Sequence, residues 1–126
     1  MPDRNTLLRY ALTAFGLVFI LLYPLAIIWP SGWAWHHGAP YESHYFMMIV
    51  GIYGTWGVFL LRAARDPHAH ESLIWFTIWS SVVHAAIMTV QSFSAPEHMG
   101  HMLGDVPALL IAAGVLAFLV KAPRKG

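Results

Sequence analysis

The chain has 126 residues, of which 58% are hydrophobic and only 10% are charged, whereas soluble domains average about 25% charged residues. Seven Lys and Arg against six Asp and Glu leave a formal net charge of +1, which excludes the broad basic surface of a nucleic-acid-binding protein. Cysteine is absent, so any bound metal must be held by His, Met, carboxylate or amide groups. This composition is typical of a membrane protein.

Four long apolar stretches occupy most of the chain, at about residues 7–29, 44–64, 73–93 and 103–120. A helix rises about 1.5 Å per residue, so about 20 residues cross a hydrocarbon core of about 30 Å. The alternation of polar and apolar residues that a membrane β-barrel needs is missing from these stretches. We therefore predict one all-α transmembrane domain over residues 1–126, folded as an antiparallel four-helix bundle.

The first helix is predicted at about residues 7–29. Its apolar run from Ala11 to Trp29 exceeds the roughly 7 to 15 residues of a secretory signal and ends at Trp29–Pro30 instead of a small-residue cleavage site, so we expect it to be a membrane span. Pro24 lies inside this run and predicts a kink, because proline cannot donate a backbone hydrogen bond to the preceding turn.

Capping signals place the other helices. The second is predicted at about 44–64. Asp66–Pro67 is typical of an N-cap followed by proline in the first turn, which predicts a third helix at 67–93. The sequence from Ser94 to Glu97 has the spacing of a capping box, which predicts a fourth helix at 95–121 in a tight hairpin with the third.

The basic residues predict the orientation of the chain in the membrane. The loops 30–43 and 94–102 contain none of them, so the positive-inside rule places both termini and the central loop in the cytoplasm. The first of these outer loops and its flanks are rich in Trp and Tyr, as expected where a chain meets the lipid headgroups. The seven basic residues are Arg4, Arg9, Arg62, Arg65, Lys121, Arg124 and Lys125.

Polar side chains form a pattern across the predicted hairpin. His98, His101 and Asp105 follow an i, i+3, i+7 spacing and share one helix face. With a turn between residues 94 and 95, they lie level with Gln91, Met88 and His84 of the third helix, in that order. His84 and Asp105 would then lie about 14 to 16 Å below the turn, where ionisable groups are costly and normally face a partner or a cavity.

We interpret this outward-opening cluster first as a metal site. Imidazole with carboxylate suits Zn or Cu(II), and thioether groups favour Cu(I). The plainer alternative is that His84 only bonds to Asp105 or to a backbone carbonyl and fixes helix packing. The predicted ligands are His84, His98, His101 and Asp105, with Gln91, Glu42, His44 and Met88 as the groups around them.

Three other interpretations stay open, and whether the protein is an enzyme is not decided by the sequence. A proton-linked binder or transporter of a small organic molecule would use His84 and Asp105 as a protonatable pair, with Tyr23, Pro24 and Tyr53 along a pocket. A haem b site is less favoured, because no two His lie at equal depth on opposite helices. A structural subunit of a membrane complex, or a homo-oligomer through the glycines at 51, 54 and 57, is the third.

Two segments carry a resemblance to known proteins: LIWFTIWSSVVHAAIM at Leu73–Met88 and HMLGDVPAL at His101–Leu109. They resemble a family of small, uncharacterised four-helix bacterial membrane proteins, over about residues 30–120. The resemblance implies a location in the bacterial inner membrane. It implies no activity, ligand or site residue.

Overall fold

The computed structural model describes residues 2–33 and 39–120, apart from the side chains of residues 97 and 98. Most of these residues are helical and none of them forms a strand, which confirms the predicted all-α class. The elements in chain order are α1 (Arg4–Ile20), α2 (Leu22–Ile28), α3 (Pro30–Trp33), η1 (Pro40–Glu42), α4 (His44–Ala63), η2 (Pro67–His70), α5 (Glu71–Ser94), η3 (Pro96–Met102) and α6 (Asp105–Val120), where η marks a 3₁₀-helix.

Three helical segments are long and apolar enough to cross a membrane: His44–Ala63, Pro67–Ser94 and Met99–Val120. A fourth span is reached if α1 and α2 are counted as one broken span. Exposed side chains along these helices are mostly large and apolar, as expected for surfaces that face lipid instead of water. The chain is therefore a membrane protein by the length and composition of its helices.

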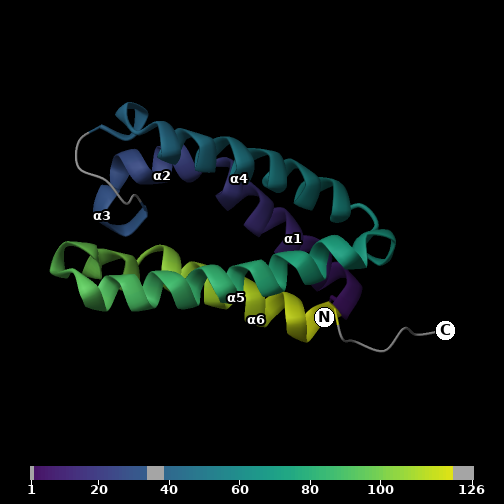
Figure 1. The fold of residues 1–126 in the computed structure, drawn as a ribbon. Helices are drawn as coiled ribbons and strands as arrows, with labels where there is room; N and C mark the ends of the chain where they lie inside the picture. The colour runs from purple at the N-terminus through teal and green to yellow at the C-terminus, as the bar shows by residue number, and fades with distance from the viewer. Residues whose placement is uncertain (1, 34–38, 121–126) are drawn as a thin grey trace.

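The first predicted helix is broken in two. The axes of α1 and α2 differ by 61°, and the break falls at Leu21, three residues before Pro24. Pro24 has no N–H to donate to the carbonyl of Ile20, and its ring crowds that carbonyl. The bend therefore lies where the proline weakens the helix, and it turns α2 and α3 across one end of the molecule (Figure 1).

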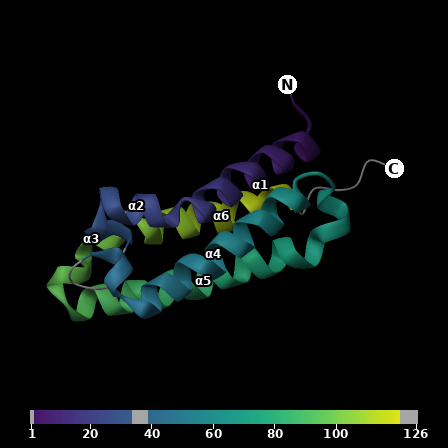
Figure 2. The same cartoon turned by 90° about the horizontal axis from the view of Figure 1, so that it is seen from above.

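The helices form two pairs that diverge along their length. α1 packs along α4, α5 packs along α6, and α1 also crosses α6 (Figures 1 and 2). The pairs lie close together near the N-terminus and the α4–α5 connection, and they lie further apart at the opposite end, where α2 and α3 sit between them. The result is a wedge whose wide end is covered by α2 and α3.

The narrow end of the wedge contains the main hydrophobic core. Leu12 of α1, Leu60 of α4, Ile74 of α5 and Leu116 of α6 are fully buried together there. The guanidinium of Arg4 lies 4.8 Å from the ring centre of Phe118 and links the start of the chain to α6. Packing from four helices fixes this end, so space between the pairs opens only toward the other.

Close backbone contacts hold the wide end shut. A side chain at Gly104 would collide with the backbone of Gly32 in α3, and one at Gly100 would collide with the carbonyl of Ser31. Gly16 and Gly57 allow a similar approach between α1 and α4. By contrast, a side chain at Gly51 would meet no neighbouring atom within 4 Å. Glycine thus sets the helix spacing at particular points and not along a whole face.

The fourth helix differs from its prediction. Instead of one α-helix over 95–121, the chain forms the 3₁₀-helix η3 and then α6, which begins only at Asp105. Pro107 lies in the first turn of α6, where its missing N–H costs nothing, whereas inside a continuous helix it would leave the carbonyl of Leu103 without a partner. Contact between α3 and η3 through Gly100 and Gly104 adds to the reasons for the late start.

Candidate functional site

A cavity of about 240 Å³ lies between the two helix pairs, on the wide side of the core. Each of the long helices contributes to its wall, together with α2, α3 and the residue before α4. The lining is mainly aromatic and aliphatic, and among the described residues its only carboxylate and imidazole are those of Asp105 and His84. The lining residues are Phe15, Val18, Phe19, Leu22, Trp33, Ser43, Tyr45, Phe46, Ile49, Tyr53, His84, Met88, Asp105, Ala108, Leu109, Ile111 and Ala112.

Tyr53 and His84 form the first polar pair of the cavity. The Tyr53 hydroxyl oxygen on α4 and Nδ1 of His84 on α5 lie 2.6 Å apart in a hydrogen bond. The Tyr53 ring is held from the side by Phe19, whose ring centre lies 4.9 Å away in an edge-to-face arrangement, and by Trp56 at 5.4 Å. This packing fixes the hydroxyl, and the hydroxyl fixes one nitrogen of His84.

His101 and Asp105 form the second pair. Nδ1 of His101 lies 3.0 Å from both carboxylate oxygens of Asp105, one turn further along the chain. When Asp105 is ionised its carboxylate only accepts hydrogen bonds, and Nδ1 of His101 then carries the hydrogen and donates it. His101 is 1% exposed, and Asp105 stands in the first turn of α6, where the helix dipole favours a negative charge.

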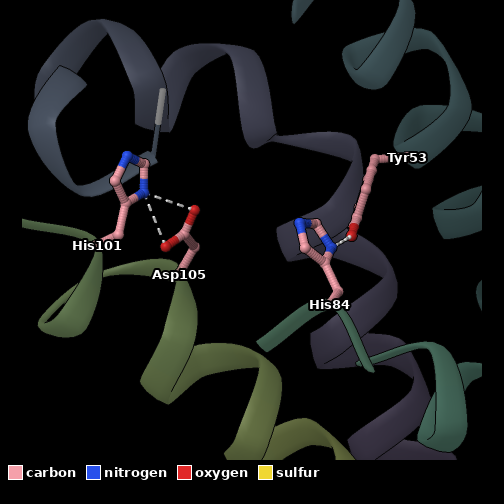
Figure 3. Close-up of polar contacts among 4 residues, drawn as sticks. All are labelled: Tyr53, His84, His101 and Asp105. Carbon is pink, nitrogen blue, oxygen red and sulfur yellow. Dashed lines mark hydrogen bonds and ion pairs between the residues drawn. The ribbon is translucent and has the colours of Figure 1, made fainter. Parts of the chain in front are cut away.

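His84 and Asp105 line the same cavity but are not hydrogen-bonded to each other. In Figure 3 the four side chains stand in a row from His101 through Asp105 and His84 to Tyr53. Each of the inner two is therefore oriented by an outer partner, and both present polar atoms to one apolar space. A small molecule in that space would meet an imidazole, a carboxylate and a phenol from three different helices.

The other residues predicted for the site are placed differently. Met88 is buried and lines the cavity. Gln91 and His44 are exposed and are not part of the lining. Glu42 is exposed as well, and its carboxylate accepts a hydrogen bond from the Ala39 N–H at 3.3 Å. The structure does not describe the side chain of His98.

The predicted metal site has no matching cluster in the described part of the chain. Among those residues, no group of three or more His, Asp or Glu side chains is arranged to hold a metal ion. The carboxylate of Asp105 is hydrogen-bonded to His101, and Gln91, Glu42 and His44 do not line the cavity. Because the side chain of His98 lies outside the described residues, a Cu or Zn site that includes it stays a prediction.

Several residues that shape the site were missed by the sequence argument. Phe46 and Trp33 wall the cavity from α4 and α3, and Trp56 donates its indole N–H to Thr77 Oγ across α4 and α5 at 2.9 Å. Thr77 is fully buried and also donates to the carbonyl of Leu73. An indole and a hydroxyl at mid-span were a usable signal, because both need partners in lipid. No sequence signal marks Phe46 or Trp33 as cavity residues.

Comparisons with known proteins give a family but no function. No curated protein and no solved structure matches the chain. Residues 3–125 match the DUF6632 family, which is described as a family of unknown function. This match is longer than the resemblance over residues 30–120, and it includes the broken first span that helps to wall the cavity. The chain therefore belongs to the DUF6632 family.

Proposed function

We propose that the protein binds a small, mostly apolar organic molecule in this cavity and recognises its polar group with His84 and Asp105. The supporting observation is that these two ionisable side chains line one apolar space, each already oriented by a partner. Small-molecule sites combine an apolar wall with a few placed polar groups in the same way. This function uses the imidazole and the carboxylate that share the apolar lining, and it needs no third ligand of the kind that a metal site requires.

The size of the cavity limits the ligand. An apolar cavity of about 150 Å³ is large enough to take benzene, and a water molecule occupies about 30 Å³ in the liquid. A cavity of about 240 Å³ thus suits one or two fused rings or a short branched chain, and is small for a drug-sized molecule. The ligand class is a compact hydrophobe with one hydrogen-bonding group.

Access to the cavity is expected from the bilayer. Tyr45 and Ile49 on α4 and Ile111 on α6 line the cavity and are also exposed on the outer surface. The spans place those exposed side chains against lipid, so a hydrophobe dissolved in the membrane would reach the cavity without crossing water. This route fits an apolar ligand better than a free metal ion.

Proton linkage follows from the groups that face the ligand. Burying a net charge in an apolar cavity is costly unless it is paired. A ligand whose polar group pairs better with one protonation state of His84 or Asp105 will favour that state when it binds. The affinity for such a ligand should therefore depend on pH, and binding should be accompanied by uptake or release of a proton.

The membrane setting belongs to the same proposal. We place the protein in the bacterial inner membrane as a four-helix bundle, with α1 and α2 as one broken span and both termini in the cytoplasm. Arg4, Arg9, Arg62 and Arg65 support this orientation, because they lie at the narrow end of the wedge and the described part of the wide end has no Lys or Arg. The cavity would then lie in the outer half of the bilayer.

Binding can be tested with two probes that differ by one hydroxyl group. 1-Naphthol should raise the unfolding temperature of the detergent-purified protein more than naphthalene does, because only 1-naphthol can bond to the polar groups. His84→Gln and Asp105→Asn should each reduce that difference, because a neutral amide bonds to the hydroxyl more weakly than a carboxylate and is placed differently from an imidazole. His68→Gln, on an exposed histidine in η2, is the matched control and should keep it. Equal responses of wild type and both cavity variants would contradict the proposal.

A further inference from the structure

A second, polar groove lies at the narrow end of the molecule, and none of its lining residues lines the cavity. It runs between the first turns of α1 and the last turn of α4 and has a volume of about 360 Å³. Two arginines and three hydroxyl-bearing side chains make up most of its wall. The lining residues are Thr6, Arg9, Tyr10, Thr13, Leu61, Ala64 and Arg65.

One of the two guanidinium groups is held in a defined position. Nε of Arg9 donates to the carbonyl of Ala64 at 2.9 Å, which caps the C-terminus of α4 from α1. This bond occupies Nε and leaves the two terminal NH₂ groups of the same fork for a ligand. Arg65 follows directly after Ala64, the residue that Arg9 contacts. The two guanidinium groups therefore meet at the C-terminal end of α4 and line the same groove.

The groove has the chemistry of a phosphate site. Guanidinium groups bind phosphate oxygens through paired, charge-assisted hydrogen bonds, and the hydroxyls of Thr6 and Tyr10 can donate further bonds. Thr13 Oγ1 already donates its hydrogen to the carbonyl of Arg9 at 2.8 Å. None of the described residues that line the groove is acidic. Of the acidic residues closest in the chain, Asp3 caps α1 by accepting the N–H of Thr6 at 2.7 Å, and Asp66 follows Arg65 outside the lining.

The position of the groove selects the source of the phosphate. It lies where α1 begins and α4 ends, at the boundary of helices that are long and apolar enough to cross a membrane. The lipid headgroups lie at that level, and Leu61 together with the ring of Tyr10 adds an apolar wall beside the cations. We infer that this groove binds the phosphate of an anionic membrane lipid between Arg9 and Arg65.

The inference can be tested by native mass spectrometry of the full chain in detergent. The protein is titrated with phosphatidylglycerol or with phosphatidylcholine, and the bound fraction is compared. An arginine near a membrane surface contributes about 1 kcal/mol to the binding of anionic lipid, which corresponds to about a fivefold change in affinity. Arg65→Gln should therefore weaken phosphatidylglycerol binding about fivefold and leave phosphatidylcholine binding unchanged.

Arg62 offers a matched control. It lies in the last turn of the same helix and is exposed, but it does not line the groove. Arg62→Gln changes the net charge equally and should retain wild-type binding. Arg9→Gln should weaken binding at least as much as Arg65→Gln. Because Arg9→Gln also removes the bond to Ala64 and can impair folding, Arg65→Gln, which keeps that bond, is the variant that tests the groove.

Three results would overturn the inference. Equal loss in Arg62→Gln and Arg65→Gln would mean that only overall charge attracts the lipid. No loss in Arg65→Gln would exclude this groove. Competition by glycerol 3-phosphate or inorganic phosphate at the concentration of the lipid would show that the groove serves a soluble phosphate compound, because the acyl chains would then contribute nothing.

Discussion

At the scale of single residues, the position of the candidate site follows mostly from the ionisable side chains within the predicted spans. His84 and Asp105 were predicted to face inward from the cost of placing such groups in lipid, and both line the cavity. The partner of Asp105, His101, lies on the face that the sequence already predicted for both. The partner of His84 could not be predicted, because helix periodicity gives the face of a side chain but not its neighbour on another helix. Tyr53 reaches His84 only through the packing of α4 beside α5.

The tyrosine hydroxyl can be removed without changing the shape of the ring. Tyr53→Phe leaves Nδ1 of His84 without its partner, so the free energy of unfolding should fall by about 1 kcal/mol and His84 should become less ordered. Chemical denaturation in mild detergent measures the first effect, and the histidine ring resonances measure the second. Tyr41→Phe, on an exposed tyrosine, should change neither. Equal stability of Tyr53→Phe and wild type would show that the hydrogen bond adds nothing.

The carboxylate of Asp105 supports a histidine that is almost fully buried. Asp105→Asn replaces a charge-assisted pair with a neutral one, and should lower the free energy of unfolding by about 1 to 3 kcal/mol. Asp66→Asn, on an exposed aspartate in the α4–α5 connection, is the control and should change it by less than about 0.5 kcal/mol. A stability loss no larger than that of the control would mean that the pair with His101 is dispensable.

At the scale of helices, local signals placed the apolar spans closely but did not predict the 3₁₀-helix at the start of the fourth. α4 ends one residue before the predicted boundary at 64, and the span that opens at Pro67 ends at Ser94. The capping-box pattern at Ser94 instead begins a 3₁₀-helix, and α6 starts ten residues after Ala95 at Asp105. Pro107 favours this late start, and the contact of η3 with α3, which joins segments about 70 residues apart, adds to it.

Substituting two different glycines by alanine tests whether glycine is needed for close helix packing. Gly104→Ala should force α3 away from η3 and lower the free energy of unfolding by about 1 to 3 kcal/mol, because the new methyl group meets the backbone of Gly32. Gly51→Ala has open space around it and should be neutral or raise stability by up to about 1 kcal/mol. Thermal unfolding of both variants in the same detergent gives the comparison. Similar behaviour of the two variants would contradict the close packing at the wide end.

At the scale of the whole molecule, composition alone predicted an all-helical membrane protein, and the helices bear this out for the described residues. The wedge could not be predicted, since it depends on the bend before Pro24 and on which helices pair. The cavity is a consequence of that wedge: the core closes the narrow end, α2 and α3 cover the other, and the space between remains.

Orientation can be measured directly because the chain has no cysteine of its own. Single cysteines at Tyr41 in η1 and at Ala69 in η2, both exposed positions, report on opposite ends. A membrane-impermeant maleimide should label Tyr41→Cys in intact spheroplasts and Ala69→Cys only after lysis. The reverse pattern would place the cavity in the inner half of the bilayer, and labelling of both in intact cells would indicate dual topology.

The central claim is that His84 and Asp105 act together on one ligand, and a double-mutant cycle tests it most directly. The binding free energy of 1-naphthol is measured for wild type, His84→Gln, Asp105→Asn and the double variant, with naphthalene as the reference in each. If both groups hold the same hydroxyl, the account predicts a coupling of at least about 0.5 kcal/mol between the two substitutions. Strictly additive losses, or no loss in either single variant, would contradict it.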